Sequence, residues 1–278
     1  MKLHTNMRLK EINKFDIPKF SKYLLNIGNG KEKKDIQTGK IQLCPTFCNL
    51  SSNITDLIDK VYPNLNQHIT DHKWLQQRGI LSTTNLRVNE INSTILETIP
   101  GESHSYYSIH TVLSEDETTN YPVEFLNSLN PSGLPQHNIT LKYGSPIMLL
   151  RNLDPPKLCN GTRLVVKKLN KHIIEATILT DAFKGENVFI PRIPLIPTDL
   201  PFNFKRLQFP VRLGFAITIN KSQGQSLNIT GIDLRDECFS HGQLYVAMSR
   251  AKDPKNLYIL TNENNFTKNI VYTKILKD

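Results

Sequence analysis

Residues 78–92 read RGILSTTNLRVNEIN, and this stretch decides the fold class. A short apolar run of strand-forming residues passes through the polar pair Thr83–Thr84 into a segment whose apolar residues recur at helical spacing. The pattern predicts a strand, a turn and a helix with Asn85 as its N-cap. One face of that helix would consist of Val88, Ile91, Ile95 and Leu96. A strand that leads into a helix through a polar turn is typical of α/β domains, in which ligands bind at strand ends.

Helical spacing also occurs before this stretch. Residues 17–27 (IPKFSKYLLNI) predict a short helix that ends at the glycine-rich residues 28–30, and residues 54–61 (ITDLIDKV) predict another. After residue 209, strand and helix patterns alternate again, and a last helix is expected near residues 265–276. Both ends of the chain therefore have α/β character.

The middle of the chain, from about residue 142, has a different pattern. Short apolar segments are separated by Gly, Pro and Asn and show no helical period, which predicts a small β-barrel or sandwich of four or five strands. Neither flanking piece alone has enough strands for a sheet covered on both faces. We therefore expect one α/β domain formed by residues 1–141 and 209–278 and split by an all-β insert at residues 142–208.

Composition limits the classes of protein to consider. A chain of 278 residues has room for two compact units, and its 38% hydrophobic and 21% charged residues exclude collagen, coiled coil and wholesale disorder. No apolar run reaches the roughly 18–20 residues of a membrane helix, and the first residues lack the apolar core of a secretory leader, so neither a membrane nor a secreted protein is expected. Cys44 and Cys48 lack a second Cys or His pair at zinc-finger spacing, so no metal site is expected.

The charge of the chain indicates a polyanionic partner. Lys and Arg number 34 against 25 Asp and Glu, which gives a formal net charge of +9. Such an excess is typical of proteins that bind nucleic acid. Solvated surface lysines without any partner are the alternative that composition leaves open.

The sequence contains no phosphate-binding P-loop of its own. The Gly-Lys pairs at 30–31 and 39–40 are followed by Glu and Ile, where the motif needs Ser or Thr to bind magnesium. Residues 220–223 (NKSQ) differ from the guanine-reading Asn-Lys-x-Asp in their final Gln. We therefore expect no tight ATP site formed by this chain alone.

Two segments nevertheless carry groups suited to phosphate chemistry. Residues 209–227 (FPVRLGFAITINKSQGQSL) place Thr, Asn, Lys, Ser and Gln beside a glycine, a set that contacts phosphate backbones without reading bases; the alternative is a helix cap with a solvated lysine. Residues 241–251 (HGQLYVAMSRA) place Arg250 at the end of an amphipathic stretch. An arginine there can clamp a phosphoryl group or, as the alternative, complement a helix dipole.

Together these segments resemble the fifth and sixth helicase motifs of superfamily 1, specifically of the Pif-type DNA helicases, which are related to the bacterial RecD subunit. Residues 3–8 (LHTNMR) resemble the fourth motif, and residues 78–92 resemble the strand–turn–helix block that follows it. Within residues 133–163, the stretches GLPQH, LKYGSPIMLLRNL and LCNGTR are similar to a signature of Pif-type proteins carried by Helitron transposons. The matched blocks occur in order along nearly the whole chain.

The resemblance implies a RecA-like motor domain with an SH3-like insert. Pif-type helicases have two RecA-like domains with ATP in the cleft between them and single-stranded DNA across both. This chain resembles the second motor domain, and a first domain, in cis or in trans, would supply the P-loop. The implied cofactors are ATP and Mg²⁺, and the implied partners are single-stranded and forked DNA.

The resemblance also assigns roles to ten residues. Arg8 and Arg250 would reach the γ-phosphate as catalytic groups. Gln223, Gly224 and Gln225 would line the nucleotide cleft. DNA phosphates would be held by Thr84, Asn85, Thr218, Lys221 and Ser222. No function is assigned to residues 10–75, which match the family more loosely.

The function implied is that of an ATP-dependent 5′-to-3′ DNA helicase, as in DNA repair, recombination, telomere maintenance or Helitron transposition. Because the P-loop domain is missing from the matched blocks, we expect this chain to be inactive alone. The alternative function is a non-catalytic module that binds single-stranded nucleic acid. The resemblance to Helitron proteins favours the nucleus, with the mitochondrion as the alternative location.

Overall fold

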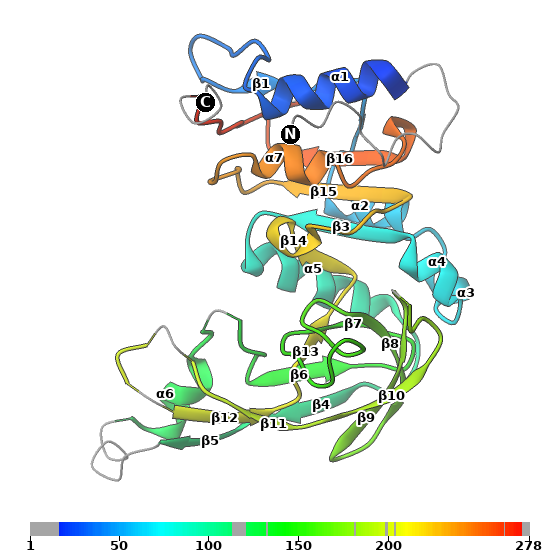
Figure 1. Ribbon diagram of the computed structural model, residues 1–278, viewed down its shortest axis with the longest axis vertical. Helices are drawn as coiled ribbons and strands as arrows, with labels where there is room; N and C mark the ends of the chain where they lie inside the picture. The colour runs from blue at the N-terminus through cyan, green and yellow to red at the C-terminus, as the bar shows by residue number, and fades with distance from the viewer. Residues whose placement is uncertain are drawn as a thin grey trace. The chain divides into compact units, whose positions relative to one another are not determined.

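The structure is a computed structural model that describes residues 17–112, 121–131, 133–180, 182–197, 200–202, 204–263 and 265–273. The described chain forms two compact units (Figure 1). Unit 1 contains residues 17–68, 74–95 and 215–273, and unit 2 contains residues 69–73 and 96–214. These limits are those of units that are compact by their internal contacts. The domain limits expected after residues 141 and 208 rest on the sequence pattern and stay a prediction.

Unit 1 is organised around a five-stranded parallel sheet with the strand order β14-β3-β15-β16-β2. The strands are β2 Asn49–Leu50, β3 Arg78–Ser82, β14 Ala216–Thr218, β15 Ile229–Leu234 and β16 Leu257–Thr261. In the central strands β3 and β15 every residue after the first is buried, as expected for a parallel sheet covered on both faces. The order places β3 between strands from the far end of the chain.

Helices of unit 1 match most of the sequence-based expectations. They are α1 Ile17–Gly28, α2 Ile54–Val61, α3 Leu65–His68, α4 His72–Gln76, α5 Asn85–Thr98 and α7 Gln243–Met248, with 3-10 turns η3 Ile219–Ser222 and η4 Pro254–Asn256. Helix α2 packs on β15 at Gly231, where an added Cβ would come within 2.8 Å of Val61 Cγ2. The close approach of helix and sheet therefore requires glycine at that position.

The strand–turn–helix prediction for residues 78–92 is confirmed, with one shift at the cap. Helix α5 begins at Asn85, and the cap is Thr84, whose hydroxyl and carbonyl accept from the amides of Arg87 (3.4 Å) and Val88 (3.2 Å). The N-cap prediction at Asn85 was therefore wrong by one residue. The predicted apolar face of this helix is buried at Val88, Ile91, Ile95 and Leu96.

The helix expected near residues 265–276 is absent from residues 265–273. Strand β17 (Phe266–Thr267) pairs there with β1 (Ile41–Gln42), and the Asn269 side chain donates a hydrogen bond to the Ile27 carbonyl at 2.8 Å. Thr, Val, Ile and Asn residues in this stretch have low helix propensity, and these tertiary contacts hold it extended. Residues 274–276 of the expected helix lie outside the described residues.

Unit 2 is built on antiparallel strands. A five-stranded sheet has the order β10-β9-β8-β7-β13 and comprises β7 Pro146–Leu149, β8 Arg163–Leu169, β9 Ile173–Ile178, β10 Asn187–Pro191 and β13 Val211–Leu213. Short strands without helices are what the sequence predicts for this stretch. The edge strands β10 and β13 do not pair with one another in the described part of the chain. That this sheet belongs to an SH3-like barrel therefore stays a prediction.

The rest of unit 2 has two smaller sheets and one helix. Strand β4 (His104–Tyr107) pairs with β6 (Asn138–Leu141), and β12 (Phe204–Gln208) lies between β11 (Ile193–Leu195) and β5 (Ile109–Val112); helix α6 spans Val123–Ser128. These elements surround the fully buried Arg206. Its guanidinium donates to His110 Nε2 at 2.8 Å and to the carbonyls of Pro135, Leu126 and Leu129 at 2.9–3.0 Å.

No helix within the described ranges is both long and apolar enough to span a bilayer.

Candidate functional site

The carboxyl ends of β3 and β14 bring two groups of predicted site residues to one edge of the parallel sheet. The strands are adjacent, and Thr218 lies opposite Ser82 in the register. Thr84 and Asn85 follow β3 directly, and Lys221 lies in the 3-10 turn that follows β14. This edge is where open α/β sheets bind ligands. We call Thr84, Asn85, Thr218, residues 219–225 and Arg250 the sheet-edge site.

Arg250 is packed against the loop that follows the 3-10 turn. The residue is 7% exposed, and its Nη1 donates to the carbonyls of Ser222 (3.3 Å) and Gln225 (3.1 Å). Nε donates to the Val246 carbonyl at 2.9 Å, and Nη2 donates to the Ser249 hydroxyl at 2.8 Å. These four acceptors are neutral oxygens, and a planar guanidinium held in this way is a group that suits a phosphate.

The loop at residues 223–225 contains a turn that favours glycine. Gly224 has φ +87°, and apart from its two chain neighbours no atom of the described residues lies within 4 Å of the position of an added Cβ. Gln223 and Gly224 are exposed, whereas Gln225 is half-buried. The side-chain Oε1 of Gln225 is buried and has no hydrogen-bond partner among the residues that the structure describes. An exposed glycine turn beside a buried cation can accept a nucleotide phosphate, so the residues present fit the implied ATP.

The predicted DNA-contacting residues differ in how they present their polar groups. Lys221 and Asn85 are exposed, and Thr218 is half-buried. Ser222 is fully buried, and its hydroxyl donates to the Ile219 carbonyl at 2.6 Å, which closes the 3-10 turn. In this structure the buried Ser222 hydroxyl therefore stabilises the 3-10 turn and is not exposed to solvent. Its contact with DNA, like the other assigned roles, stays a prediction.

A network of ion pairs next to Thr84 was missed by the sequence-based predictions. The Thr84 hydroxyl donates to Asp236 Oδ2 at 2.8 Å, and Arg87 Nε donates to Oδ1 of the same carboxylate at 3.1 Å. Arg87 Nη1 also binds Glu90 at 2.9 Å. A threonine hydroxyl has a single proton, so Thr84 can offer a further ligand only acceptor lone pairs while it binds Asp236.

Arg235 extends the network into the sheet. Its guanidinium binds the fully buried Asp233 through two hydrogen bonds of 3.0 and 2.9 Å, and its Nη1 binds Glu90 at 3.0 Å. Hydrogen bonding to Asp233 raises the pKa of Arg235 above its ordinary value. Burial would raise the pKa of Glu90, but Arg87 and Arg235 outweigh it and hold that pKa below its ordinary value. We call Arg87, Glu90, Asp233, Arg235 and Asp236 the ion-pair network.

The sequence does contain one signal for this network. Residues 233–236 read DLRD and begin at the last two residues of the apolar strand β15. Charged residues at the carboxyl end of a parallel strand are expected near a ligand site. Their partners on α5, however, come from a distant part of the chain.

Two further predictions concern Arg8 and the cysteine pair Cys44 and Cys48. Arg8, expected to act beside Arg250, lies outside the described residues. Cys48 is buried and its thiol donates to the Cys44 carbonyl at 3.5 Å. Burial raises the pKa of the Cys48 thiol to about 12. The thiolate form that binds metals is therefore disfavoured at this cysteine.

The parallel sheet of unit 1 and its helices have the architecture of the RecA-like α/β class, to which helicase motor domains belong. Comparison with known proteins then identifies the family. Residues 124–169 match the family model of the 2B domain of the DNA helicase Pif1. The chain is 33% identical over 196 residues to the ATP-dependent DNA helicase PIF1 of Xenopus laevis, which covers 69% of this chain and 29% of that protein.

Solved structures agree with this relationship. The crystal structure of the Pif1 helicase from Candida albicans matches with a TM-score of 0.57 and 26% identity, over 81% of this chain and 55% of that chain. The Bacteroides Pif1 helicase in complex with ADP-AlF3 and ssDNA matches in fold with a TM-score of 0.59 and 21% identity, over 98% of this chain and 53% of that chain. The chain thus belongs to the Pif1-type helicase family, and it spans about half of these solved chains.

Proposed function

We propose that the chain is the C-terminal part of an ATP-dependent 5′-to-3′ DNA helicase and supplies one side of its ATP cleft. The observation that carries this proposal is the contact of Arg250 with the carbonyls of Ser222 and Gln225. It places a cation directly beside the exposed turn at Gly224. In this role Arg250 stabilises the charge that develops on the γ-phosphate, and Arg8 contributes from the same chain.

The sheet-edge site would also couple nucleotide to DNA. Thr218 and Lys221 precede Gly224 by only a few residues, within one continuous turn and loop. A change at the phosphate of ATP that moves the Arg250–Gln225 contact would therefore shift Lys221 as well. Single-stranded DNA would bind along this edge through Thr84, Asn85, Thr218 and Lys221, with the backbone rather than the bases contacted.

Several features support single-stranded DNA as the partner. The chain has a net charge of +9, and the Bacteroides relative was solved with ssDNA. We also propose that forked DNA is a substrate and that unit 2 contains a small SH3-like insert. The cellular role would be in the nucleus, in repair, recombination, telomere maintenance or transposition.

ATP hydrolysis would require a P-loop domain in cis or in trans. The sequence has no G-x-x-x-x-G-K-[ST] motif, so this chain would supply Arg250 but neither the phosphate cradle nor the Mg²⁺ ligands of that motif. In the complete site ATP would provide the phosphoryl group, and Mg²⁺ would neutralise part of its negative charge. The residues of this chain orient the nucleotide from the opposite side.

The test compares the purified chain with its mixture with a separately expressed Pif1-type P-loop domain. We expect no DNA-stimulated ATP hydrolysis by the chain alone and measurable hydrolysis in the mixture. Arg250→Ala should lower the rate in the mixture by at least about 10³-fold. Hydrolysis by the chain alone that disappears in Arg250→Ala would contradict the proposal.

A non-catalytic module for single-stranded nucleic acid is the second candidate. It is favoured by the hydrogen bonds of Arg250, which are made within the chain and keep the loop folded without a nucleotide. The same mixture separates the two functions. If ssDNA binds with equal affinity with and without ATP and the P-loop domain, and no hydrolysis occurs, the module is the better description.

A further inference from the structure

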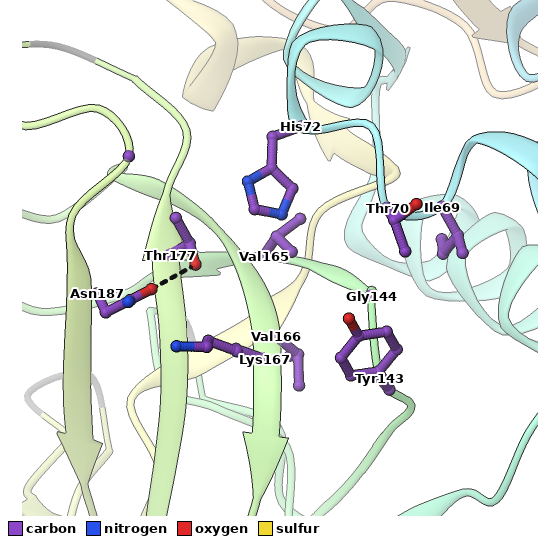
Figure 2. Close-up of a pocket in the computed structure, with 11 residues that line it drawn as sticks. Ile69, Thr70, His72, Tyr143, Gly144, Val165, Val166, Lys167, Thr177 and Asn187 are labelled. Carbon is purple, nitrogen blue, oxygen red and sulfur yellow. Dashed lines mark hydrogen bonds between the residues drawn. The ribbon is translucent and has the colours of Figure 1, made fainter.

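Unit 2 contains a pocket of about 320 Å³ that the sheet-edge site does not use (Figure 2). Its floor is the face of strands β8, β9 and β10 that points away from the main core of the unit. On β8, Leu164 and Val166 belong to that core, and Val165 between them therefore faces the other side. Lys167 lies in a β-bulge between Val166 and Lys168 and also lines the pocket. The pocket thus occupies a sheet face that the core leaves uncovered.

A row of side chains crosses the three strands on this floor. Val165 lies opposite Thr177, and Thr177 lies opposite Asn187. The Thr177 hydroxyl donates to Asn187 Oδ1 at 2.8 Å, as drawn in Figure 2. This bond fixes the orientation of the Asn187 amide and leaves its N–H groups to face a ligand. The row therefore offers an apolar surface at one end and hydrogen-bond donors at the other.

Two ring side chains form the walls. Residues 69–73 belong to unit 2 by their contacts, and the His72 imidazole projects from this segment over Val165 (Figure 2). Tyr143 lies on another side of the pocket and is 59% exposed. The segment is held close by Gly144, where an added Cβ would lie 2.7 Å from Ile69 Cγ1.

A cation completes the lining. Lys167 Nζ binds Glu175 Oε1 at 2.7 Å, and the lysine side chain remains 46% exposed. An ammonium group has three donors, so this ion pair leaves capacity for an anionic group of a ligand. Glu175 reduces the positive charge here, and binding of an anion would have to compete with it.

We propose that this pocket binds one nucleotide unit of single-stranded DNA, with the base against Tyr143 and His72 and a phosphate at Lys167. The edge of the base would meet the Asn187 amide. At about 320 Å³ the pocket lies at the small end of the range of ligand sites, about 300–1,000 Å³, which suits a single nucleoside rather than a length of strand. The inference rests on the proposed function only in taking single-stranded DNA as the source of the nucleotide.

Matched variants test the pocket by fluorescence anisotropy with a labelled thymidylate oligonucleotide. Tyr143→Leu should weaken binding about five- to tenfold, because base stacking on an aromatic ring is lost. The control Tyr107→Leu removes a tyrosine of nearly equal exposure, 60%, elsewhere in unit 2 and should change affinity less than twofold. Lys167→Gln should weaken binding, whereas Lys171→Gln, which removes the same charge in the exposed turn after β8, should not.

A strand of abasic residues separates the base from the phosphate. On that strand Tyr143→Leu and the wild-type chain should bind alike. Competition by free thymidine monophosphate identifies the source of the ligand: displacement of the oligonucleotide means that a free nucleotide also enters the pocket, and no displacement means that only a strand does.

Equal losses for Tyr143→Leu and Tyr107→Leu, or a Tyr143 effect that persists on the abasic strand, would overturn the pocket and leave the proposed function standing. If the wild-type chain binds no single-stranded DNA even at low salt, both the proposed function and this pocket are refuted.

Discussion

The Thr84 hydroxyl donates its only proton to Asp236, and this hydrogen bond limits what Thr84 would offer to the DNA strand that we propose binds there. A phosphate oxygen placed at Thr84 would face an acceptor with a carboxylate directly behind it. Arg87 compensates part of that negative charge through its own bond to Asp236. Asp236 therefore opposes a polyanion at this point of the sheet-edge site, while it keeps the Thr84 cap in place.

Replacement of Asp236 by asparagine should strengthen single-stranded DNA binding. Asp236→Asn removes the charge but keeps an oxygen that can accept from Thr84, so affinity at low salt should rise about two- to fivefold. The matched control is Asp56→Asn on α2, which removes the charge of a carboxylate paired with Lys60 in the same unit. Equal rises in both variants, measured by fluorescence anisotropy, would mean that net charge alone is responsible.

At the scale of secondary-structure elements, local patterns were enough for some predictions and not for others. Strand β3 and helix α5 follow from the order of apolar and polar residues within one stretch, and both are present. The prediction of a last helix was wrong because strand β17, within residues 265–273, pairs with β1, which is far away in sequence. The ion-pair network and the partners of Arg250 could not be predicted, since they depend on strand order and on loops distant along the chain.

The elements around Arg206 should make unit 2 sensitive to acid. Burial, and then the charge of Arg206, lower the pKa of His110 to about 4 from its ordinary value of 6.5. In the unfolded chain the His110 imidazole therefore binds a proton below about pH 6.5. In the folded chain the same imidazole stays neutral until about pH 4. The stability contributed is complete above pH 6.5 and is lost as the pH falls to 4. The difference in pKa corresponds to about 3.4 kcal/mol, which solvent screening of the half-buried ring reduces to about 2 kcal/mol.

Urea unfolding of the chain between pH 4 and 7 measures this loss. His110→Gln should flatten the pH dependence, because its amide cannot be protonated and can still accept from Arg206. His172→Gln removes an exposed imidazole of the same unit and should retain the wild-type dependence. A wild-type slope in His110→Gln would show that other groups are responsible for the acid sensitivity.

At the scale of the whole molecule, the net charge of +9 and the sheet-edge site should contribute differently to DNA binding. Most of the side chains proposed to hold phosphates are neutral, and Lys221 is the cation among them. General attraction by the remaining charge should therefore dominate at low salt and fade as the Debye length shrinks.

A salt titration of single-stranded DNA binding separates these contributions. Lys221→Gln should reduce the slope of log K against log salt by about 0.7, the value for one phosphate contact on a single strand. Lys252→Gln, which removes the same charge outside the sheet-edge site, should lower affinity slightly at low salt and reduce the slope by much less than Lys221→Gln. If the two variants behave alike, Lys221 contributes only to the general attraction.

The strand order of unit 1 also sets the order in which the chain can fold during synthesis. Strand β3 is hydrogen-bonded on its two sides to β14 and β15, and both are translated after residue 214. Within the ranges that the structure describes, strand β2 likewise pairs with β16 alone, which comes later still. On the ribosome, therefore, residues 96–214 of unit 2 emerge completely while β3 still lacks both neighbours. During this interval the apolar strand β3 has no strand partner and is prone to aggregation, so a chaperone would be needed most at this stage.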